Sequence, residues 1–268
     1  MLSQRAKKRN SQQPSIFHRV IQNRQYSYPT LGIVFIGINL LVTIPLAAVL
    51  NIWFDEAYSL NTTGHTLGYT FSQAIGFEEQ APVYFVLLFL WRQINDSIFW
   101  ARLFSMSCIA GVIGLSPYLS RLYLKNLHPV YLTAIVALNP FIVWMALEVR
   151  LYALSTLIVA VLLYLFPRAY LKTEPYRWHQ LIYSAVALLG LYTHYFIGLL
   201  LIAHGIVLLC KGGPVKRSFI AFTGHMLLVG LCFTPMIVNI VGQVSQLSDN
   251  TKISASGILT TPESSLME

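Results

Sequence analysis

Long apolar runs without charged residues follow one another from residue 30 to residue 248, and this feature restricts the fold more than any other. A helix needs about 20 apolar residues to cross a bilayer. Only 10% of the 268 residues are charged, whereas a soluble domain carries about 25%. We therefore predict an all-α integral membrane protein, a helix bundle in which seven or eight segments lie in the bilayer. The apolar segments are residues 30–50, 81–91, 103–120, 129–147, 151–166, 180–193, 195–210 and 218–248.

The net charge of +8 comes largely from a basic N-terminal tail, residues 1–29, which contains no acid. Such a tail is typical of the cytoplasmic side of a membrane protein, so we exclude nucleic acid as a partner and expect a multi-pass protein of the cell inner or plasma membrane with a cytoplasmic N-terminus. The loop 51–80 carries four of the ten acids and no Lys or Arg, so it is predicted to lie outside. The transmembrane module then spans 30–241, and a polar C-terminal tail spans 242–268.

Two features complicate this topology. If every apolar run crossed, the basic turns 121–128 and 168–179 would lie outside, against the charge rule. The short run 81–94 is the best candidate for a segment that does not cross. Asn139-Pro140 interrupts the run 129–147 and is expected to kink or shorten that helix, because proline removes a backbone donor.

The outer loop begins with Asp55 and Glu56, directly after the first apolar run. A carboxylate near lipid is costly and is usually retained for a function. Trp53, Phe54 and Tyr58 are expected to shield the pair from bulk water. Farther along the loop, Leu67, Phe71 and Ile75 recur every four residues, which predicts a short amphipathic helix on the membrane surface.

Five motifs occur in a characteristic order: FDEAYSL at 54–60, EEQAPVYF at 78–85, ARLFS at 101–105, NPFIVWMALEVRLYAL at 139–154 and LYTHYF at 191–196. In these motifs the chain resembles bacterial family-39-type glycosyltransferases of the GT-C fold, a group similar to protein O-mannosyltransferases and to the lipid A aminoarabinose transferase. Two features depart from that pattern. Gln80 and Ala81 stand where relatives usually have a His and a second Pro, and the chain is shorter than relatives, as a C-terminal truncation would make it.

The resemblance implies a hexosyl- or pentosyltransferase that takes a sugar from a polyprenyl-phosphate carrier. The acceptor hydroxyl is left open between protein, lipid and glycan. Asp55 matches the catalytic base, which removes the proton of the acceptor hydroxyl. Glu56 is a candidate for binding the acceptor or for supporting Asp55.

The leaving group is an anionic phosphate and needs positive charge. Arg150, with Tyr152 beside it, is the first candidate for binding this phosphate, because arginine can bind it bidentately. Arg102 is the second, although both arginines could instead reach toward lipid head groups. Glu148 is expected to pair with Arg92 or Arg102.

A divalent metal (Zn, Mn or Mg) is a further expectation, with Glu78, Glu79 and His194 as its candidate ligands. The alternative for His194 is a hydrogen-bonded structural residue. Two other functions stay open: a membrane transporter or lipid flippase, which the intramembrane charges would also suit, and an inactive truncated glycosyltransferase.

Overall fold

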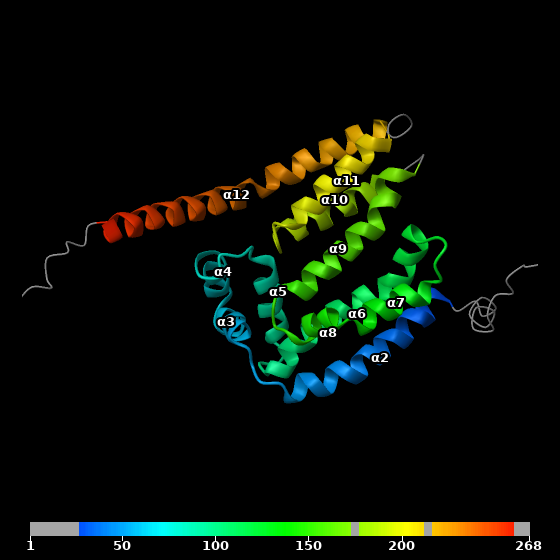
Figure 1. The fold of residues 1–268 in the computed structure, drawn as a ribbon, viewed down its shortest axis with the longest axis horizontal. Coiled ribbons are helices and arrows are strands. Elements are labelled where there is room, and N and C mark those ends of the chain that lie inside the picture. Colours follow the sequence, from blue (N-terminus) through cyan, green and yellow to red (C-terminus); the bar gives the residue numbers. More distant parts are fainter. Residues whose placement is uncertain (1–26, 173–176, 212–215, 260–268) are drawn as a thin grey trace, which may run out of the picture.

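The computed structural model describes residues 27–172, 177–211 and 216–259, and every regular element in these ranges is a helix (Figure 1). The basic tail up to residue 26 and the end of the polar tail from residue 260 lie outside the described residues. The helices are α2 (Tyr28–Val49), α3 (Phe54–Thr62), α4 (Leu67–Gly76), α5 (Val83–Arg92), α6 (Ile98–Tyr123), α7 (Pro129–Leu138), α8 (Pro140–Leu147), α9 (Tyr152–Phe166), the π-helix η1 (Pro167–Leu171), α10 (Arg177–Leu191), α11 (Ile197–Lys211) and α12 (Lys216–Leu259). The all-α prediction is confirmed.

Within these residues, four helical segments are long and apolar enough to cross a membrane: α2, α6, α9 continued by η1, and the part of α12 at 217–242. The pair α7 and α8 makes a fifth if it counts as one bent span. Each of the eight predicted apolar segments is helical, but α5, α10 and α11 have only 10, 15 and 15 residues. The structure therefore supports four or five spans by length and composition, fewer than the seven or eight predicted.

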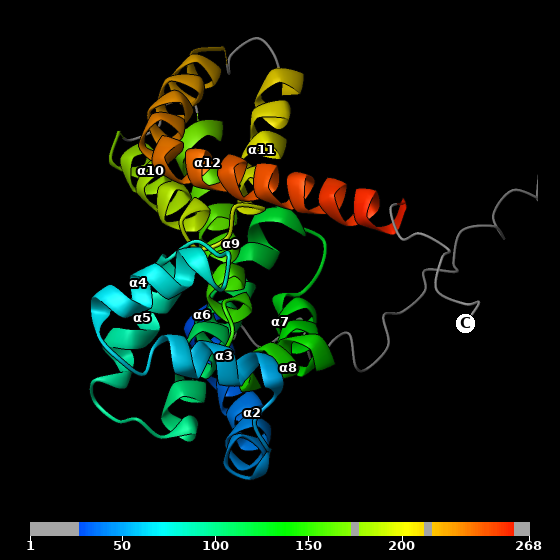
Figure 2. The same ribbon diagram turned by 90° about the vertical axis from the view of Figure 1, so that its left-hand side faces the viewer.

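Helix α6 is the central helix of the bundle and packs against α2, α7, α8 and α9. Its contact with α2 is close, because a Cβ atom on Gly32 would stand 3.3 Å from the Cα of Gly114. Small residues that let two backbones approach are the usual basis of helix packing in lipid. Helices α10, α11 and α12 form a second group, which joins the first through α9 (Figures 1 and 2).

The basic turns lie at one end of the bundle, together with the start of α2; we call this the basic end. Tyr118 of α6 contacts the rings of Tyr28 and Tyr164, at centroid distances of 5.5 and 6.2 Å. The guanidinium of Arg168 lies over the Tyr164 ring at 3.6 Å. In Figure 1 the last turns of α6 and α11 and the first turns of α7, α10 and α12 lie at this end.

The acid-rich loop 51–80 lies at the opposite end, which we call the acidic end. Helix α5 begins and finishes there: the Val83 amide donates to Tyr192 O between α10 and α11 (3.0 Å), and Arg92 donates to Leu60 O at the end of α3 (2.6 Å). At 1.5 Å per residue α5 is about 15 Å long, half the thickness of the hydrocarbon core. Because both ends of α5 lie at the acidic end, α5 does not cross the bundle, and the next helix, α6, starts again from the acidic end. The basic turns then lie together at the other end, in agreement with the charge rule.

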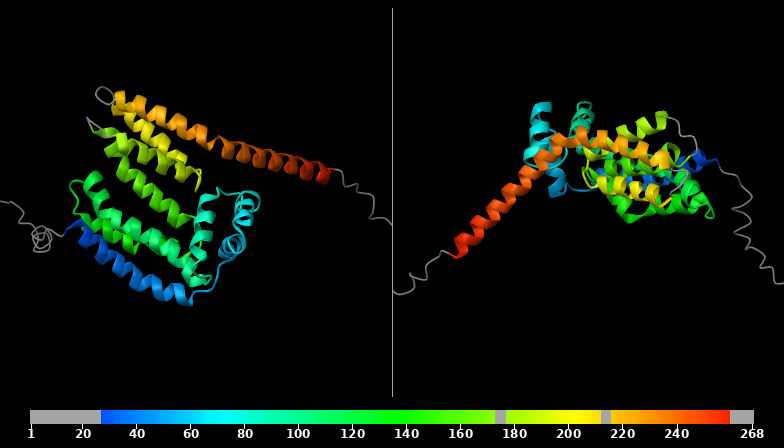
Figure 3. Two further views of the ribbon diagram at one scale, coloured as in Figure 1. Left: turned by 180° about the vertical axis from the view of Figure 1, so that it is seen from behind. Right: turned by 90° about the horizontal axis from the view of Figure 1, so that it is seen from above.

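The loop 51–80 is largely helical. The predicted short helix with Leu67, Phe71 and Ile75 is confirmed as α4, and its place on a membrane surface stays a prediction, whereas α3 was not predicted. At the far side of the bundle α12 runs past the other helices and continues to Leu259, beyond the predicted apolar run (Figure 3). The kink expected at Asn139-Pro140 is confirmed as a bend of 51° between α7 and α8.

Candidate functional site

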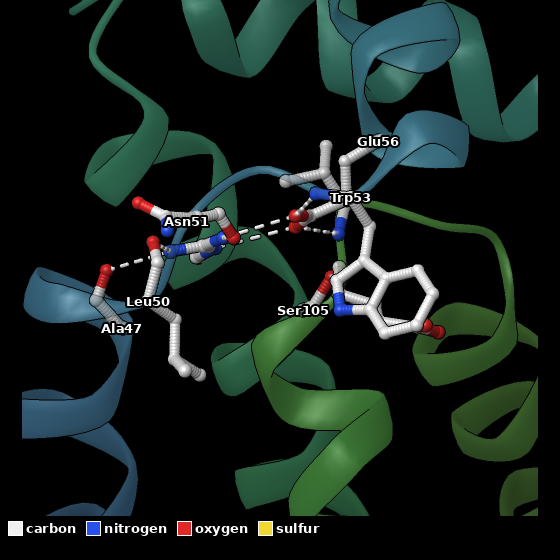
Figure 4. Close-up of polar contacts among 9 residues, drawn as sticks. Ala47, Leu50, Asn51, Trp53, Glu56 and Ser105 are labelled. Atoms are coloured by element: carbon white, nitrogen blue, oxygen red, sulfur yellow. Dashed lines mark hydrogen bonds and ion pairs between the residues drawn. The ribbon is translucent and has the colours of Figure 1, made fainter.

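Glu56 and Arg102 form a buried ion pair at the acidic end. Nη2 of Arg102 lies 2.9 Å from Oε2 of Glu56, and its Nε lies 3.2 Å from Oε1. The side chain of Arg102 is 2% exposed and that of Glu56 is 1% exposed. The Glu56 carboxylate also accepts the amides of Trp53 and Val149, each at 3.0 Å. Figure 4 shows these bonds converging on Glu56.

Arg102 also satisfies the end of α2. It donates to the carbonyls of Ala47 (3.0 Å) in the last turn of α2 and of Leu50 (2.8 Å) and Asn51 (2.9 Å) directly after it (Figure 4). Carbonyls at a helix C-terminus have no partner inside the helix. A cation is favourable at a helix C-terminus for the same reason. Both members of the pair are thus occupied by protein groups, and they join α2, α3, α6 and the start of the 148–151 turn. Their expected contacts with substrate are not part of this arrangement.

Arg150 has a different environment. Only its Nη1 donates hydrogen bonds, to Asp55 O (3.4 Å), Ser59 Oγ (3.4 Å) and Glu78 Oε2 (3.3 Å). All three are longer than the usual 2.7–3.2 Å. Within the described part of the chain, its buried Nε has no partner and its Nη2 donates no hydrogen bond. The Nε–Nη2 edge, which can bind carboxylate or phosphate bidentately, therefore has no hydrogen-bond partner among the described residues, and its Nε is enclosed by the protein.

Glu78 holds Arg150 from the loop side. Its Oε2 takes part in the ion pair, while Oε1 accepts from Thr62 Oγ1 at 2.9 Å. The next residue, Glu79, has φ of 52°, a left-handed conformation that non-glycine residues adopt at some cost. Glu79 is exposed. The strained turn separates the two carboxylates, so that the Glu78 side chain faces the protein and that of Glu79 faces outward.

Asp55 lies in the first turn of α3 and is exposed. The shielding expected from its neighbours is absent, because Trp53 and Phe54 are themselves 59% and 71% exposed. In the described structure the Asp55 carboxylate receives no hydrogen bond, whereas its carbonyl accepts from Arg150. Asp55 is thus an accessible carboxylate on a residue whose backbone carbonyl bonds Arg150.

Glu148 is a second acid at this site that sequence reasoning did not select for a function. Its predicted pairing is wrong, because Arg102 bonds Glu56, and Arg92 bonds Leu60 O and Thr63 Oγ1. Burial raises the pKa of Glu148, and the negative charges of Glu56 and Asp55 act in the same direction. Its place next to Arg150 in the motif was the signal that could have identified it.

Tyr84 in the first turn of α5 is also close to the group. Its side chain is 1% exposed, and its hydroxyl has no hydrogen-bond partner among the described residues. It lies within the electrostatic reach of Arg150, Glu56 and Glu78. An unpaired buried hydroxyl is uncommon and indicates a site that takes a further polar group or a water molecule.

The remaining predicted residues do not join this cluster through any contact in the described structure. Tyr152 is 41% exposed at the start of α9. His194 lies in the α10–α11 turn, where its Nδ1 accepts from the Phe196 amide at 3.3 Å, and burial lowers its pKa. This contact agrees with the structural alternative for His194.

The predicted metal ligands do not form a metal site. Over residues 27–172, 177–211 and 216–259, no group of three or more His, Cys, Asp or Glu side chains could hold a metal ion. Both Glu78 oxygens are bonded to protein donors, and Glu79 faces away. A divalent metal therefore stays a prediction of the sequence alone.

The acidic end thus combines three different environments: a saturated ion pair, Glu56–Arg102; Arg150, whose Nε–Nη2 edge has no hydrogen-bond partner among the described residues; and two carboxylates, Asp55 and Glu148. No family model, curated protein or solved structure matches this chain.

Proposed function

We propose that the protein is a membrane glycosyltransferase that moves a sugar from a polyprenyl-phosphate carrier to an acceptor hydroxyl at the acidic end of the bundle. The observation that carries the proposal is the Nε–Nη2 edge of Arg150, which has no hydrogen-bond partner among the described residues, on an arginine that also bonds the carbonyl of the exposed Asp55. An oxyanion-binding edge next to a base is what displacement of a phosphate leaving group requires. The resemblance in the five sequence motifs supports the same reaction.

The proposed orientation follows from the distribution of charge between the two ends. All basic turns and the start of α2 lie at the basic end, which we assign to the cytoplasm. The acidic end then faces the extracytoplasmic side of the membrane. A sugar on a lipid carrier suits this side, because the carrier delivers an activated sugar without a soluble nucleotide-sugar pool.

The proposed step is an inverting displacement. Asp55 takes the proton of the acceptor hydroxyl while the acceptor oxygen forms a bond to the anomeric carbon of the sugar. The bond from that carbon to the phosphate oxygen breaks, and its electron pair leaves with the polyprenyl phosphate. Arg150 stabilises the charge that develops on the phosphate.

In this proposal, the saturated pair Glu56–Arg102 is structural and fixes the backbone around Asp55. It holds the N-terminus of α3 through the Trp53 amide and the 148–151 turn through the Val149 amide. Asp55 and Arg150 are the sequence neighbours of these anchored groups. Rigid support of this kind keeps a base and a cation in a reactive arrangement.

The test is binding of a polyprenyl monophosphate to the purified protein in nanodiscs. Arg150→Lys keeps the charge but loses the bidentate edge, so we expect about tenfold weaker binding, and Arg150→Gln should bind less still. The matched control is Arg168→Gln, because Arg168 lies at the basic end over Tyr164 and should not affect binding.

A polyprenyl alcohol without phosphate separates binding of the head group from binding of the chain. We expect the alcohol to bind equally weakly to wild type and Arg150→Gln. Equal affinity of wild type and Arg150→Gln for the phosphate would contradict the assignment of Arg150. It would leave the arginine with a structural role only.

A further inference from the structure

Asn39 lies in the middle of α2, in a helix that is otherwise apolar along most of its length. It is 2% exposed, and its Nδ2 donates to the carbonyl of Ala137 in α7 at 2.8 Å. The two residues are 98 positions apart in the chain. A polar side chain placed at this depth of a bilayer is costly, so its partner indicates why it is there.

The carbonyl of Ala137 is available because the helix is broken at the next turn. In a continuous α-helix it would accept the amide of Phe141. In this protein the Phe141 amide donates instead to Oδ1 of Asn139, at 2.8 Å, and Pro140 has no amide hydrogen. In lipid, a carbonyl released by a break must find a donor in a neighbouring helix. Asn39 supplies that donor.

The bend matters for the candidate site because α8 leads directly to it. Glu148 follows the last residue of α8, and its amide donates to Trp144 O at 3.2 Å. The next amide, of Val149, donates to Glu56, and Ser105 Oγ donates to the carbonyl of Glu148 at 2.6 Å. The direction in which α8 leaves the bend therefore sets where the turn 148–150 meets α3 and α6.

We propose that Asn39 is a positioning residue: by satisfying Ala137 at the bend, it fixes the direction of α8 and so seats Arg150 at the acidic end. Asn39 touches neither Glu56 nor Arg150 in any contact of the described structure, and acts on them only through α8. The part of this inference that concerns ligand binding rests on the proposed function. The part that concerns the seat of residues 148–150 does not.

The chain offers a matched control in Thr43. It lies one turn after Asn39 on the same helix, is 0% exposed, and donates its hydroxyl to the carbonyl of Asn39 in its own helix at 3.0 Å. Asn39→Leu and Thr43→Val both replace a buried polar side chain in α2 by an apolar one of similar size. Only the first removes the bond to the bend.

The experiment measures hydrogen exchange at residues 148–150 in the full chain in nanodiscs. We expect Asn39→Leu to raise the exchange rate there about five- to tenfold, which corresponds to the loss of one hydrogen bond. Thr43→Val should leave the exchange rate unchanged. Asn39→Leu should also weaken binding of a polyprenyl monophosphate by a similar factor. If Asn39→Leu lowers only the unfolding temperature, or if both variants raise exchange at 148–150 equally, the positioning role is refuted.

A double variant keeps the test decisive if Asn39→Leu does not accumulate. Pro140→Ala removes the steric cause of the bend and lets the Phe141 amide return to Ala137. Asn39→Leu with Pro140→Ala should therefore fold and still lose protection at 148–150, whereas full protection would overturn the proposal. A wild type that binds no polyprenyl phosphate would overturn the proposed function, while the exchange result would still decide the role of Asn39.

Discussion

The carboxylate of Glu56 and the guanidinium of Arg102 lie 2.9 Å apart in a fully enclosed position where four chain segments meet. Arginine bonds three carbonyls at the end of α2, and glutamate bonds two amides from α3 and the 148–151 turn. A buried pair is favourable only when its remaining donors and acceptors are satisfied, and here they are. The pair therefore organises the acidic end. Near it lie the exposed Asp55 and Arg150, whose Nε–Nη2 edge has no hydrogen-bond partner among the described residues.

Substitution of either member of the pair is expected to destabilise the fold. Arg102→Lys cannot bond Glu56 and three carbonyls at once, and Arg102→Leu leaves a buried carboxylate unpaired, which costs about 3–5 kcal/mol. The measurement is the unfolding temperature of the detergent-solubilised protein, with Arg168→Lys as the control. Unchanged stability in Arg102→Leu would show that the pair does not hold the acidic end together.

Asp55→Asn is expected to abolish most transfer while the fold and polyprenyl-phosphate binding stay intact. Asp55 is exposed and its carboxylate receives no bond in the described structure, so the change removes a base without removing a structural contact. Loss of general-base help typically lowers a rate about 10²- to 10⁴-fold. The assay is transfer from a panel of hexosyl and pentosyl polyprenyl phosphates in membranes.

The control for this assay is Asp96→Asn, because Asp96 is an exposed acid near the same end, with 90% of its side chain accessible. Glu56→Gln should reduce activity together with stability, because it weakens the buried pair. Wild-type turnover in Asp55→Asn would remove Asp55 from the mechanism. Glu148 would then be the remaining carboxylate to test as the base.

Glu148 is expected to make stability depend on pH. Its pKa in the folded state is raised by burial above the ordinary value of 4.5, so the folded protein binds this proton more tightly than the unfolded chain. The penalty for the charged form is absent below pH 4.5, grows as the pH rises through the raised pKa, and remains at neutral pH. Glu148→Gln should therefore stabilise the protein at pH 7 and have no such effect at pH 4.

The measurement is the difference in unfolding temperature between wild type and Glu148→Gln from pH 4 to pH 8. The exposed Glu79→Gln serves as the control, and its difference should vary less with pH. A constant difference for Glu148→Gln across this range would contradict burial as the cause. A difference that grows toward low pH would reverse the sign of the argument.

The orientation can be tested with single cysteines in a background without Cys108, Cys210 and Cys232. Ser72 on α4 and Lys125 between α6 and α7 are both exposed, at opposite ends of the bundle. Ser72→Cys should react with an impermeant thiol reagent in intact cells, and Lys125→Cys only after lysis. The reverse pattern would place the acidic end in the cytoplasm, where the proposed lipid-carried donor has no advantage.

The sequence by itself determined the helices. Apolar runs and breaks predicted where the long helices lie, except that α12 continues to Leu259, eleven residues past the predicted run. Asn139-Pro140 predicted the bend. These features depend on local chemistry: backbone hydrogen bonds in lipid and the missing proline donor. The motifs also selected Asp55, Glu56, Arg102, Glu78 and Arg150, which the structure brings together. Their gathering at one end follows from the alternation of helix directions. The motifs selected Glu79, Tyr152 and His194 as well, and these do not join the cluster through any contact in the described structure.

Only the tertiary structure decided which of these residues pair with one another, since pairing depends on distances between segments far apart in the chain. Arg102 and Arg150 look alike in the sequence, yet Glu56 and the end of α2 bond every nitrogen of Arg102, while the Nε–Nη2 edge of Arg150 has no partner in the part of the chain that the structure describes. The same holds for α5, whose composition suits a membrane span but whose ends both meet partners at the acidic end. A helix of about 15 Å is too short to reach across the bilayer, so its neighbours, not its composition, determine the topology.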